Sequence, residues 1–184
     1  GKIRKRPTSV HENRIDMTAY EELTNKATMG VSMDIGIVGG GLSGMFAARL
    51  LSDLGHNVTV WDKGSRIGGR LTGWQTDEGS KIHLGARALD SVPMWMDRFV
   101  DEWARLGLVR REGDALIPNA PLPELLEHLS EGSSICLGSR VSGLELMQGG
   151  IRVTTESDGD GEVCRCDRVI VAVPVEQASE IASD

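Results

Sequence analysis

The stretch DIGIVGGGLSGMFAARLLSDLGHNVTVWD, residues 34–62, decides the fold. It opens with a short apolar run that has the length of a buried parallel strand. A glycine cluster follows, and a helical pattern then runs up to Gly55, which stands where a C-cap is expected. The residues at helical spacing are Leu42, Met45, Phe46, Arg49, Leu50 and Leu54. Residues 56–62 are rich in β-branched side chains and end in Asp62. The stretch therefore predicts a strand, a glycine turn, a helix and a second strand.

The glycine turn, GGGLSG at residues 39–44, has the spacing of a phosphate-binding loop. Gly39 allows a tight turn, Gly41 lets the backbone approach a pyrophosphate, and Gly44 lets the helix pack close to the strand. Free N–H groups at the helix start would face the negative charge of the phosphates. Asp62 lies 18 residues beyond Gly44, where a carboxylate can accept both hydroxyls of an adenosine ribose. The pattern predicts a dinucleotide site.

The next residues, DKGSRIGGRLTGW at 62–74, bear on which dinucleotide is bound. A second glycine doublet, Gly68 and Gly69, stands between Arg66 and Arg70. Two arginines and two glycines so close to a ribose carboxylate make a second anion cradle, which suits a longer cofactor. An NAD-linked dehydrogenase is disfavoured by these arginines and by an antiparallel insertion expected later in the chain.

The order GxGxxG, acid and R-x-G-G-R resembles the flavin-binding half of the glutathione-reductase-like fold. More narrowly, it resembles the branch that holds amine oxidases, carotenoid desaturases and renalase. The later chain is similar to the renalase-like group in a series of segments that follow in the same order. They are KIHLGARAL at 81–89, PMWMDRFVDEWARLGLV at 93–109, LPELLEHL at 122–129, GSRVSGLEL at 138–146 and CDRVIVAVPVEQASEI at 166–181. The resemblance covers about 34–182.

The resemblance implies FAD as the cofactor and assigns its contacts. It places six residues around the pyrophosphate and the ribose: Gly39, Gly41, Leu42, Ser43, Gly44 and Asp62. Lys63, beside Asp62, is also expected to bind the cofactor. Lining the cofactor it places Arg66, Gly69 and Arg70, with the backbone of Val141 at the adenine. Near the flavin ring it places Gly85, Ala86 and Arg87. No catalytic residue is assigned. His83 stands where the family usually carries an acid, and it is interpreted as a half-exposed strand histidine rather than as a flavin-site base.

The remaining chain continues an α/β, Rossmann-like pattern. A short strand is expected near 81–84, and helices are expected at 93–107 and 121–130. The apolar stripe of the first helix is Met94, Phe99, Val100, Trp103 and Leu106. A strand at 133–138 precedes three antiparallel strands at 141–147, 151–156 and 161–166, and residues 168–174 read as a buried parallel strand before a final helix. We expect an N-terminal arm at 1–33, and at 34–184 an FAD-binding domain with a parallel sheet and an antiparallel β-meander insertion.

Composition narrows the function classes. The formal net charge of −7 argues against nucleic acid as a partner. No apolar run reaches the ~18 residues that span a bilayer. Cys136, Cys164 and Cys166 match no metal spacing, so no metal site is expected and the thiols are predicted free, in a reducing intracellular compartment. The basic start, GKIRKR, leaves open a location inside an organelle.

Members of the resembled family are longer than 184 residues. We therefore expect most of the substrate domain and the last strand of the sheet to be missing, with further chain or a protein partner covering that sheet edge. Two functions stay open. One is an FAD-dependent oxidoreductase of renalase or amine-oxidase type, which would oxidise an amine or a reduced nicotinamide-like substrate and pass electrons to oxygen. The other is a non-catalytic flavoprotein-fold subunit with a binding or structural role in a larger assembly.

Overall fold

The computed structural model describes residues 30–71, 73–75, 81–83, 88–90, 96–119, 122–156 and 161–181. The chain divides into two compact units, Gly1–Val31 and Ser32–Asp184, and every element described below belongs to the second. The predicted arm lies almost entirely outside the described residues. Within the described parts of the chain, no helix has the length and apolar character needed to cross a membrane.

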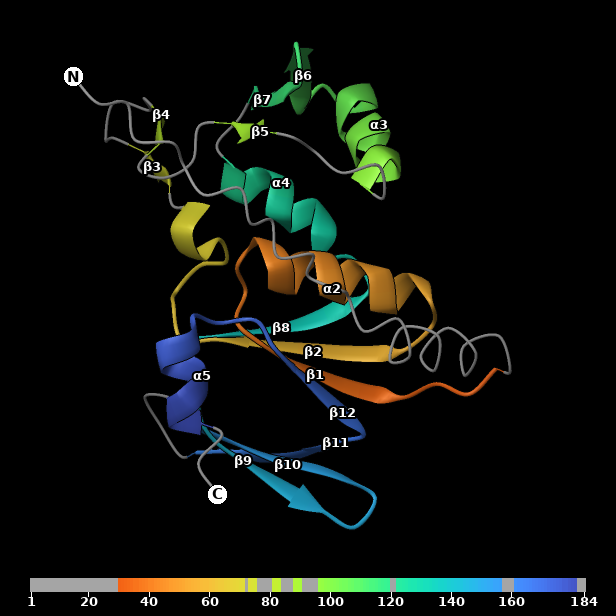
Figure 1. Cartoon of the computed structure of the whole chain (residues 1–184), viewed down its shortest axis with the longest axis vertical. Helices are drawn as coiled ribbons and strands as arrows, with labels where there is room; N and C mark the ends of the chain where they lie inside the picture. Colours follow the sequence, from red (N-terminus) through yellow and green to blue (C-terminus); the bar gives the residue numbers. More distant parts are fainter. Residues whose placement is uncertain are drawn as a thin grey trace, which may run out of the picture. The chain divides into compact units, whose positions relative to one another are not determined.

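A four-stranded parallel sheet forms the centre of this unit (Figure 1). Its strand order is β12 (Arg168–Val171), β1 (Asp34–Val38), β2 (Asn57–Asp62) and β8 (Ser133–Leu137), and each neighbouring pair is parallel. The register pairs Ile37 of β1 with Val60 of β2 and with Ile170 of β12. Ile37 and Val60 are fully buried, as expected for strands covered on both faces. The predicted βαβ unit is confirmed.

Helix α2 (Leu42–Asp53) joins β1 to β2 and covers one face of the sheet (Figure 1). Its C-cap is Leu54, one residue before the predicted Gly55, and the φ of 84° at Gly55 allows two closing bonds. The Gly55 N–H donates to the Ser52 carbonyl and the His56 N–H donates to the Leu51 carbonyl, which is a Schellman motif. The buried residues of α2 differ in part from the expected set. Ala48 and Leu51 were not in that set and are buried, whereas Arg49 was in it and makes ion pairs.

Two further helices pack on the same side. Helix α3 (Asp97–Arg105) contributes Phe99 and Trp103, whose rings lie 5.1 and 5.7 Å from that of Phe46. Helix α4 (Leu122–Leu129) buries apolar residues and contacts α2. Both predicted helices exist, and each ends before its expected last residue, at Arg105 and Leu129. Leu106 was expected in the buried stripe and is 52% exposed, because α3 ends at Arg105.

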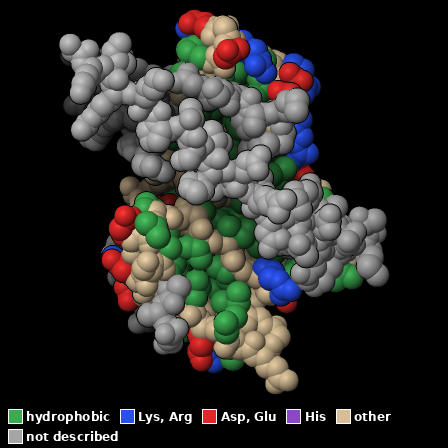
Figure 2. All heavy atoms as spheres, viewed as in Figure 1, with side chains coloured by type: hydrophobic (Ala, Val, Ile, Leu, Met, Phe, Trp, Pro, Cys, Tyr) green, Lys and Arg blue, Asp and Glu red, His purple; other side chains and the backbone are tan. Residues whose placement is uncertain are grey.

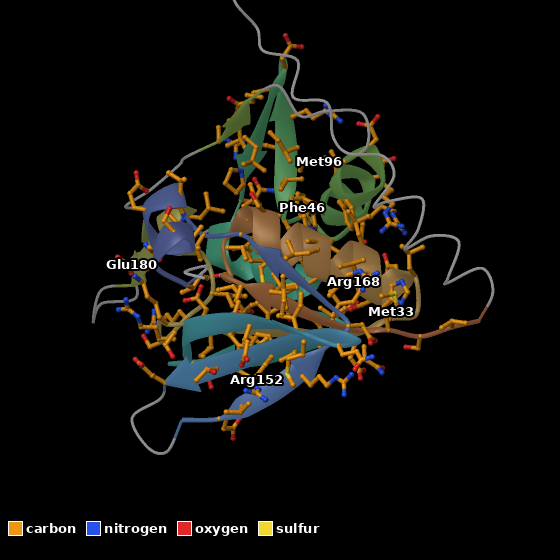
Figure 3. All side chains as sticks on the ribbon, turned by 60° about the horizontal axis from the view of Figure 1, so that its bottom comes forward. Met33, Phe46, Met96, Arg152, Arg168 and Glu180 are labelled. Atoms are coloured by element: carbon orange, nitrogen blue, oxygen red, sulfur yellow. The ribbon has the colours of Figure 1, made fainter. Side chains whose placement is uncertain are left out.

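An antiparallel β-meander covers the opposite face of the parallel sheet, as Figures 1 and 3 show. It consists of β9 (Arg140–Met147), β10 (Gly150–Glu156) and β11 (Val163–Cys166), in the order β11-β10-β9. Its inner side chains form one apolar cluster with the underside of the sheet and with α5 (Val175–Ile181). The buried members of that cluster are Val38, Trp61, Val141, Val153, Cys166 and Ile181. The predicted meander insertion is therefore confirmed.

Small antiparallel elements complete the unit, and most were not predicted. β3 (Gly73–Gln75) pairs with β4 (Lys81–His83), close to the strand expected near 81–84. β5 (Leu89–Asp90), β7 (Ala115–Pro118) and β6 (Val109–Glu112) form a three-stranded sheet. A two-residue turn joins β6 to β7, and Gly113 has a φ of 61° there. A short 3-10 helix, η1 (Gly69–Leu71), begins at the last residue of the second glycine doublet.

Strand β12 corrects one expectation. Residues 168–174 were predicted to form a buried parallel strand, yet β12 ends at Val171 and its side chains are half-buried or exposed. The reason is its position, because among the described strands β12 has only β1 as a neighbour. Its Ile170 and Val171 line a pocket instead of a closed core.

Candidate functional site

A pocket of about 1020 Å³ opens at the carboxyl ends of β1, β2 and β12. This end of a parallel sheet is where α/β folds bind ligands. Figure 2 shows hydrophobic side chains at the surface over the region of α5 and the parallel sheet. The lining falls into two walls. One wall is the glycine-rich side, with Gly39, Gly41, Leu42, Ser43, Asp62, Lys63, Gly68, Gly69 and Leu71, and the other includes Arg140, Val141, Ile170–Pro174, Gln177, Glu180 and Ile181.

The first glycine turn has the tight turn at Gly39 and the close helix packing at Gly44 that the sequence predicted. Gly39 has a φ of 106°, and a Cβ there would lie 2.8 Å from Val173 Cγ1. A Cβ on Gly44 would overlap the carbonyl oxygen of Gly39, so α2 can pack this closely only with a glycine at that position. Gly41 differs, because a Cβ there would meet nothing within 4 Å. The Gly41 backbone therefore faces the open pocket, at the N-cap of α2.

The N-terminus of α2 meets the pocket without an acidic neighbour on the helix. The first turn of α2 carries no acidic side chain, and the N-cap makes no side-chain hydrogen bond. Leu42 and Ser43 line the pocket directly after Gly41. Unsatisfied N–H groups and the positive end of the helix dipole at such a position favour an anionic group.

The second glycine doublet lies against the first turn. The Gly68 N–H donates to the Gly40 carbonyl at 2.9 Å. A Cβ on Gly69 would lie 3.6 Å from Gly41 Cα, so the two loops are in direct contact. Gly68 and Gly69 have φ values of 129° and 51°, and both are left-handed conformations that favour glycine. The two glycine motifs, separate in the sequence, form one surface of the pocket.

The Asp62 carboxylate joins these loops. Its Oδ2 accepts the Gly40 N–H at 2.6 Å, and its Oδ1 accepts the Gly64 N–H at 2.7 Å. The sequence predicted a ribose acceptor at this position but did not indicate these backbone bonds. Asp62 is partly buried and lines the pocket, and the exposed Lys63 follows it in the same wall.

The opposite wall contains residues that sequence reasoning missed. Arg140 Nη2 lies 3.1 Å from Glu180 Oε2, so an ion pair joins the start of β9 to α5. Gln177 lines the pocket from the same helix, one turn before Glu180. Val141, expected at the adenine, is buried in this wall. The helical spacing of 177 and 180 could have suggested a shared face, but nothing local pairs Glu180 with Arg140.

The remaining predicted residues lie outside the pocket lining or outside the described residues. Arg66 is exposed and is not part of the pocket lining. The side chain of Arg70 and residues 84–87, which include Gly85, Ala86 and Arg87, lie outside the described residues, as does the His83 side chain. Among the described residues, no group of three or more His, Cys, Asp or Glu side chains could hold a metal ion.

The three cysteines line a second, smaller pocket of about 190 Å³ between the parallel sheet and β11. All three are free thiols, as predicted. Burial raises the pKa of the Cys166 thiol to about 11, and Cys164 and the carboxylates of Asp34 and Asp167 add to this effect. Burial also raises the pKa of Cys136. The Cys166 and Cys136 thiols are therefore protonated at neutral pH and are poor nucleophiles.

Two family models match the chain in succession. Residues 37–103 match an NAD(P)-binding Rossmann-like domain, and residues 96–183 match the flavin containing amine oxidoreductases. Curated relatives include an L-amino-acid oxidase of Mus musculus, 37% identical over 78 residues, which are 39% of this chain and 12% of that protein. A carotenoid phi-ring synthase of Streptomyces griseus is 44% identical over 43 residues, which are 23% of this chain and 8% of that protein.

The comparisons support a flavin amine-oxidase-type family. They also point to FAD as the cofactor. A solved structure of BexE, studied for oxidation during BE-7585A biosynthesis, has a TM-score of 0.56 and 19% identity. It covers 77% of this chain, the chain covers 31% of it, and the likeness supports the fold. The chain spans less than a sixth of the length of both curated relatives named above.

Proposed function

We propose that the pocket binds FAD and that the chain supplies the FAD site of an oxidoreductase of the amine-oxidase type. One observation carries this proposal: the two glycine loops touch around Gly41, whose Cβ position is empty and faces the pocket at the start of α2. A pyrophosphate needs such close backbone approach and such N–H groups. The amine-oxidoreductase match over residues 96–183 supports the same cofactor.

The proposed binding mode uses both walls of the pocket. The pyrophosphate would lie against Gly39–Gly44, where the N–H groups of Leu42 and Ser43 begin α2. Asp62 would accept the ribose hydroxyls beside Lys63, and the Val141 backbone would face the adenine. Gly69 and Arg70, with Arg66, would border the cofactor, and residues 85–87 would lie near the flavin ring. Residues 34–184 would then form one FAD-binding domain.

The chemistry follows from the cofactor and from what this chain can add. FAD supplies the acceptor for a hydride taken from the substrate. The described residues bind and orient the cofactor, and the apolar wall from Ile170 to Pro174 excludes water from part of the pocket. Candidate substrates are amines, reduced nicotinamide-like compounds and, from the names of the curated relatives, L-amino acids. Molecular oxygen is the proposed electron acceptor.

A spectrum and a turnover assay test the proposal together. We expect purified protein, or protein mixed with FAD, to show a bound flavin absorption band that excess NAD does not displace. Peroxide release would then be measured with L-amino acids, simple amines and dihydronicotinamides. Bound flavin without turnover would favour the non-catalytic subunit instead. Failure to bind FAD would refute the proposed function and would leave only the non-catalytic subunit, whose structural role does not require the cofactor.

A further inference from the structure

We propose that Asp62 is a positioning residue, which holds the two glycine loops together as one cradle before any nucleotide arrives. This inference rests on the proposed function, because it concerns the same pocket. The carboxylate uses both oxygens: Oδ2 accepts from Gly40 and Oδ1 accepts from Gly64. One residue thereby links the turn after β1 to the loop after β2.

The surrounding bonds converge on the same junction. The Gly68 N–H donates to the Gly40 carbonyl, so Gly40 is held from both its N–H and its carbonyl. The backbone carbonyl of Asp62 accepts the Ser139 N–H at 3.0 Å, and the Gly64 carbonyl accepts the Gly138 N–H at 2.9 Å. Three loops from distant parts of the sequence therefore meet at Asp62. Bonds from backbone N–H groups to a carboxylate are stronger than bonds between neutral groups.

Space around the carboxylate is equally restricted. A Cβ on Gly40 would lie 3.2 Å from Asp62 Oδ2, and a Cβ on Gly64 would lie 3.0 Å from Oδ1. Glycines on both sides thus let the two backbones approach the carboxylate. Gly41, one residue from Gly40, is the position that opens into the pocket. When Asp62 fixes Gly40, it also fixes the orientation of the adjoining phosphate-binding backbone.

The two roles of Asp62 separate with a ligand that lacks ribose hydroxyls. An acceptor for the ribose alone would distinguish ADP from 2′,3′-dideoxy-ADP and would contribute nothing to the second ligand. A positioning residue contributes to both, because both carry the diphosphate. In Asp62→Asn, an amide NH₂ replaces one acceptor and faces a backbone N–H donor. We therefore expect affinity for dideoxy-ADP to fall about tenfold.

Asp167→Asn is the matched control. Asp167 Oδ2 also accepts a backbone N–H, that of Asp34 at 2.9 Å, and Asp167 does not line the pocket. The control should leave the affinity for dideoxy-ADP unchanged. Hydrogen exchange adds a measurement without ligand, in which the Gly40 and Gly64 amides should exchange faster in Asp62→Asn and at the native rate in Asp167→Asn.

Each result decides a separate question. If the native chain binds neither FAD nor ADP, the proposed function fails. If ADP binds but Asp62→Asn leaves dideoxy-ADP affinity and amide exchange unchanged, the positioning role fails and the proposed function stands. An equal loss of dideoxy-ADP affinity in Asp167→Asn would also overturn the positioning role. Should Asp62→Asn not fold, Gly64→Ala crowds Oδ1 while keeping the carboxylate, and it should weaken ADP and dideoxy-ADP by the same factor.

Discussion

Replacement of Gly41 by valine should abolish cofactor binding while leaving the protein folded. Gly41 has φ −77° and ψ −177°, an extended conformation that valine adopts readily. A Cβ at this position meets nothing within 4 Å. Loss of a good N-cap residue lowers the free energy of unfolding, whereas the reduced freedom of the unfolded chain raises it. The free energy of unfolding without nucleotide should therefore change by no more than about 1 kcal/mol.

The effect on binding should be much larger. The three carbon atoms of the valine side chain would occupy the side of the pocket that Gly41 leaves open. A pyrophosphate displaced from the start of α2 would lose at least two charge-assisted hydrogen bonds, each worth about 1.5 kcal/mol or more. The expected loss is about 3 kcal/mol, which is more than about 100-fold in Kd.

The assay compares FAD binding, followed by flavin fluorescence, with urea unfolding of the nucleotide-free protein. Gly44→Ala is the matched control, because its Cβ would overlap the Gly39 carbonyl and should lower stability before any ligand is considered. Gly41→Val should lose binding and keep stability. Stoichiometric FAD retained by Gly41→Val would refute the assignment of this turn to the pyrophosphate.

Three other predictions concern packing, pH and the pocket rim. Arg49, 15% exposed, pairs with Asp53, Glu102 and Glu131, so Arg49→Met should lower the free energy of unfolding by about 2 kcal/mol in chemical denaturation, and an unchanged midpoint would contradict this. The pKa of Cys166 in the folded protein is raised from 9.0 to about 11, so its contribution to the free energy of unfolding is intact below pH 9 and should be lost between pH 9 and pH 11. In unfolding experiments across this pH range, Cys166→Ala should not show this loss of stability. Glu180→Gln, which breaks the exposed Arg140 pair, should speed FAD dissociation by less than about fivefold in stopped-flow traces, and less at high salt.

The local elements could be predicted because their signals are local. The alternation and apolar runs of residues 34–62 fix strand, helix and strand, and Gly55 marks the helix end within one residue. The meander was equally accessible, because short alternating strands were separated by glycine-rich turns. The β6–β7 hairpin was missed although Gly113 and Asp114 form a two-residue turn between its strands. Its strands are short, and one of them is mostly charged, which hides the alternation.

The site could be predicted only in part, because its contacts link distant residues. The glycines and Asp62 are recognisable from spacing, and the structure brings Gly41, Asp62, Gly69 and Val141 to one pocket. Their detailed contacts were not accessible. No local pattern shows that the Asp62 carboxylate accepts two backbone N–H groups, or that Arg140 meets Glu180 across 40 residues.

The pairing of β12 with β1 explains why the glycine motif becomes a pocket in this fold. The Ala172 N–H donates to the Val38 carbonyl at 2.8 Å, directly before the glycine turn. Val173 and the Ala172 carbonyl then lie against Gly39, where a Cβ would be too close to both. The turn can therefore approach this wall only as glycine, and the wall arrives from more than 130 residues later in the chain. Gly39 has two physical roles at once, since its positive φ makes the turn and its missing side chain admits the opposite wall. A glycine pattern alone specifies the first role, whereas the second depends on the long-range parallel pairing that places β12 beside it.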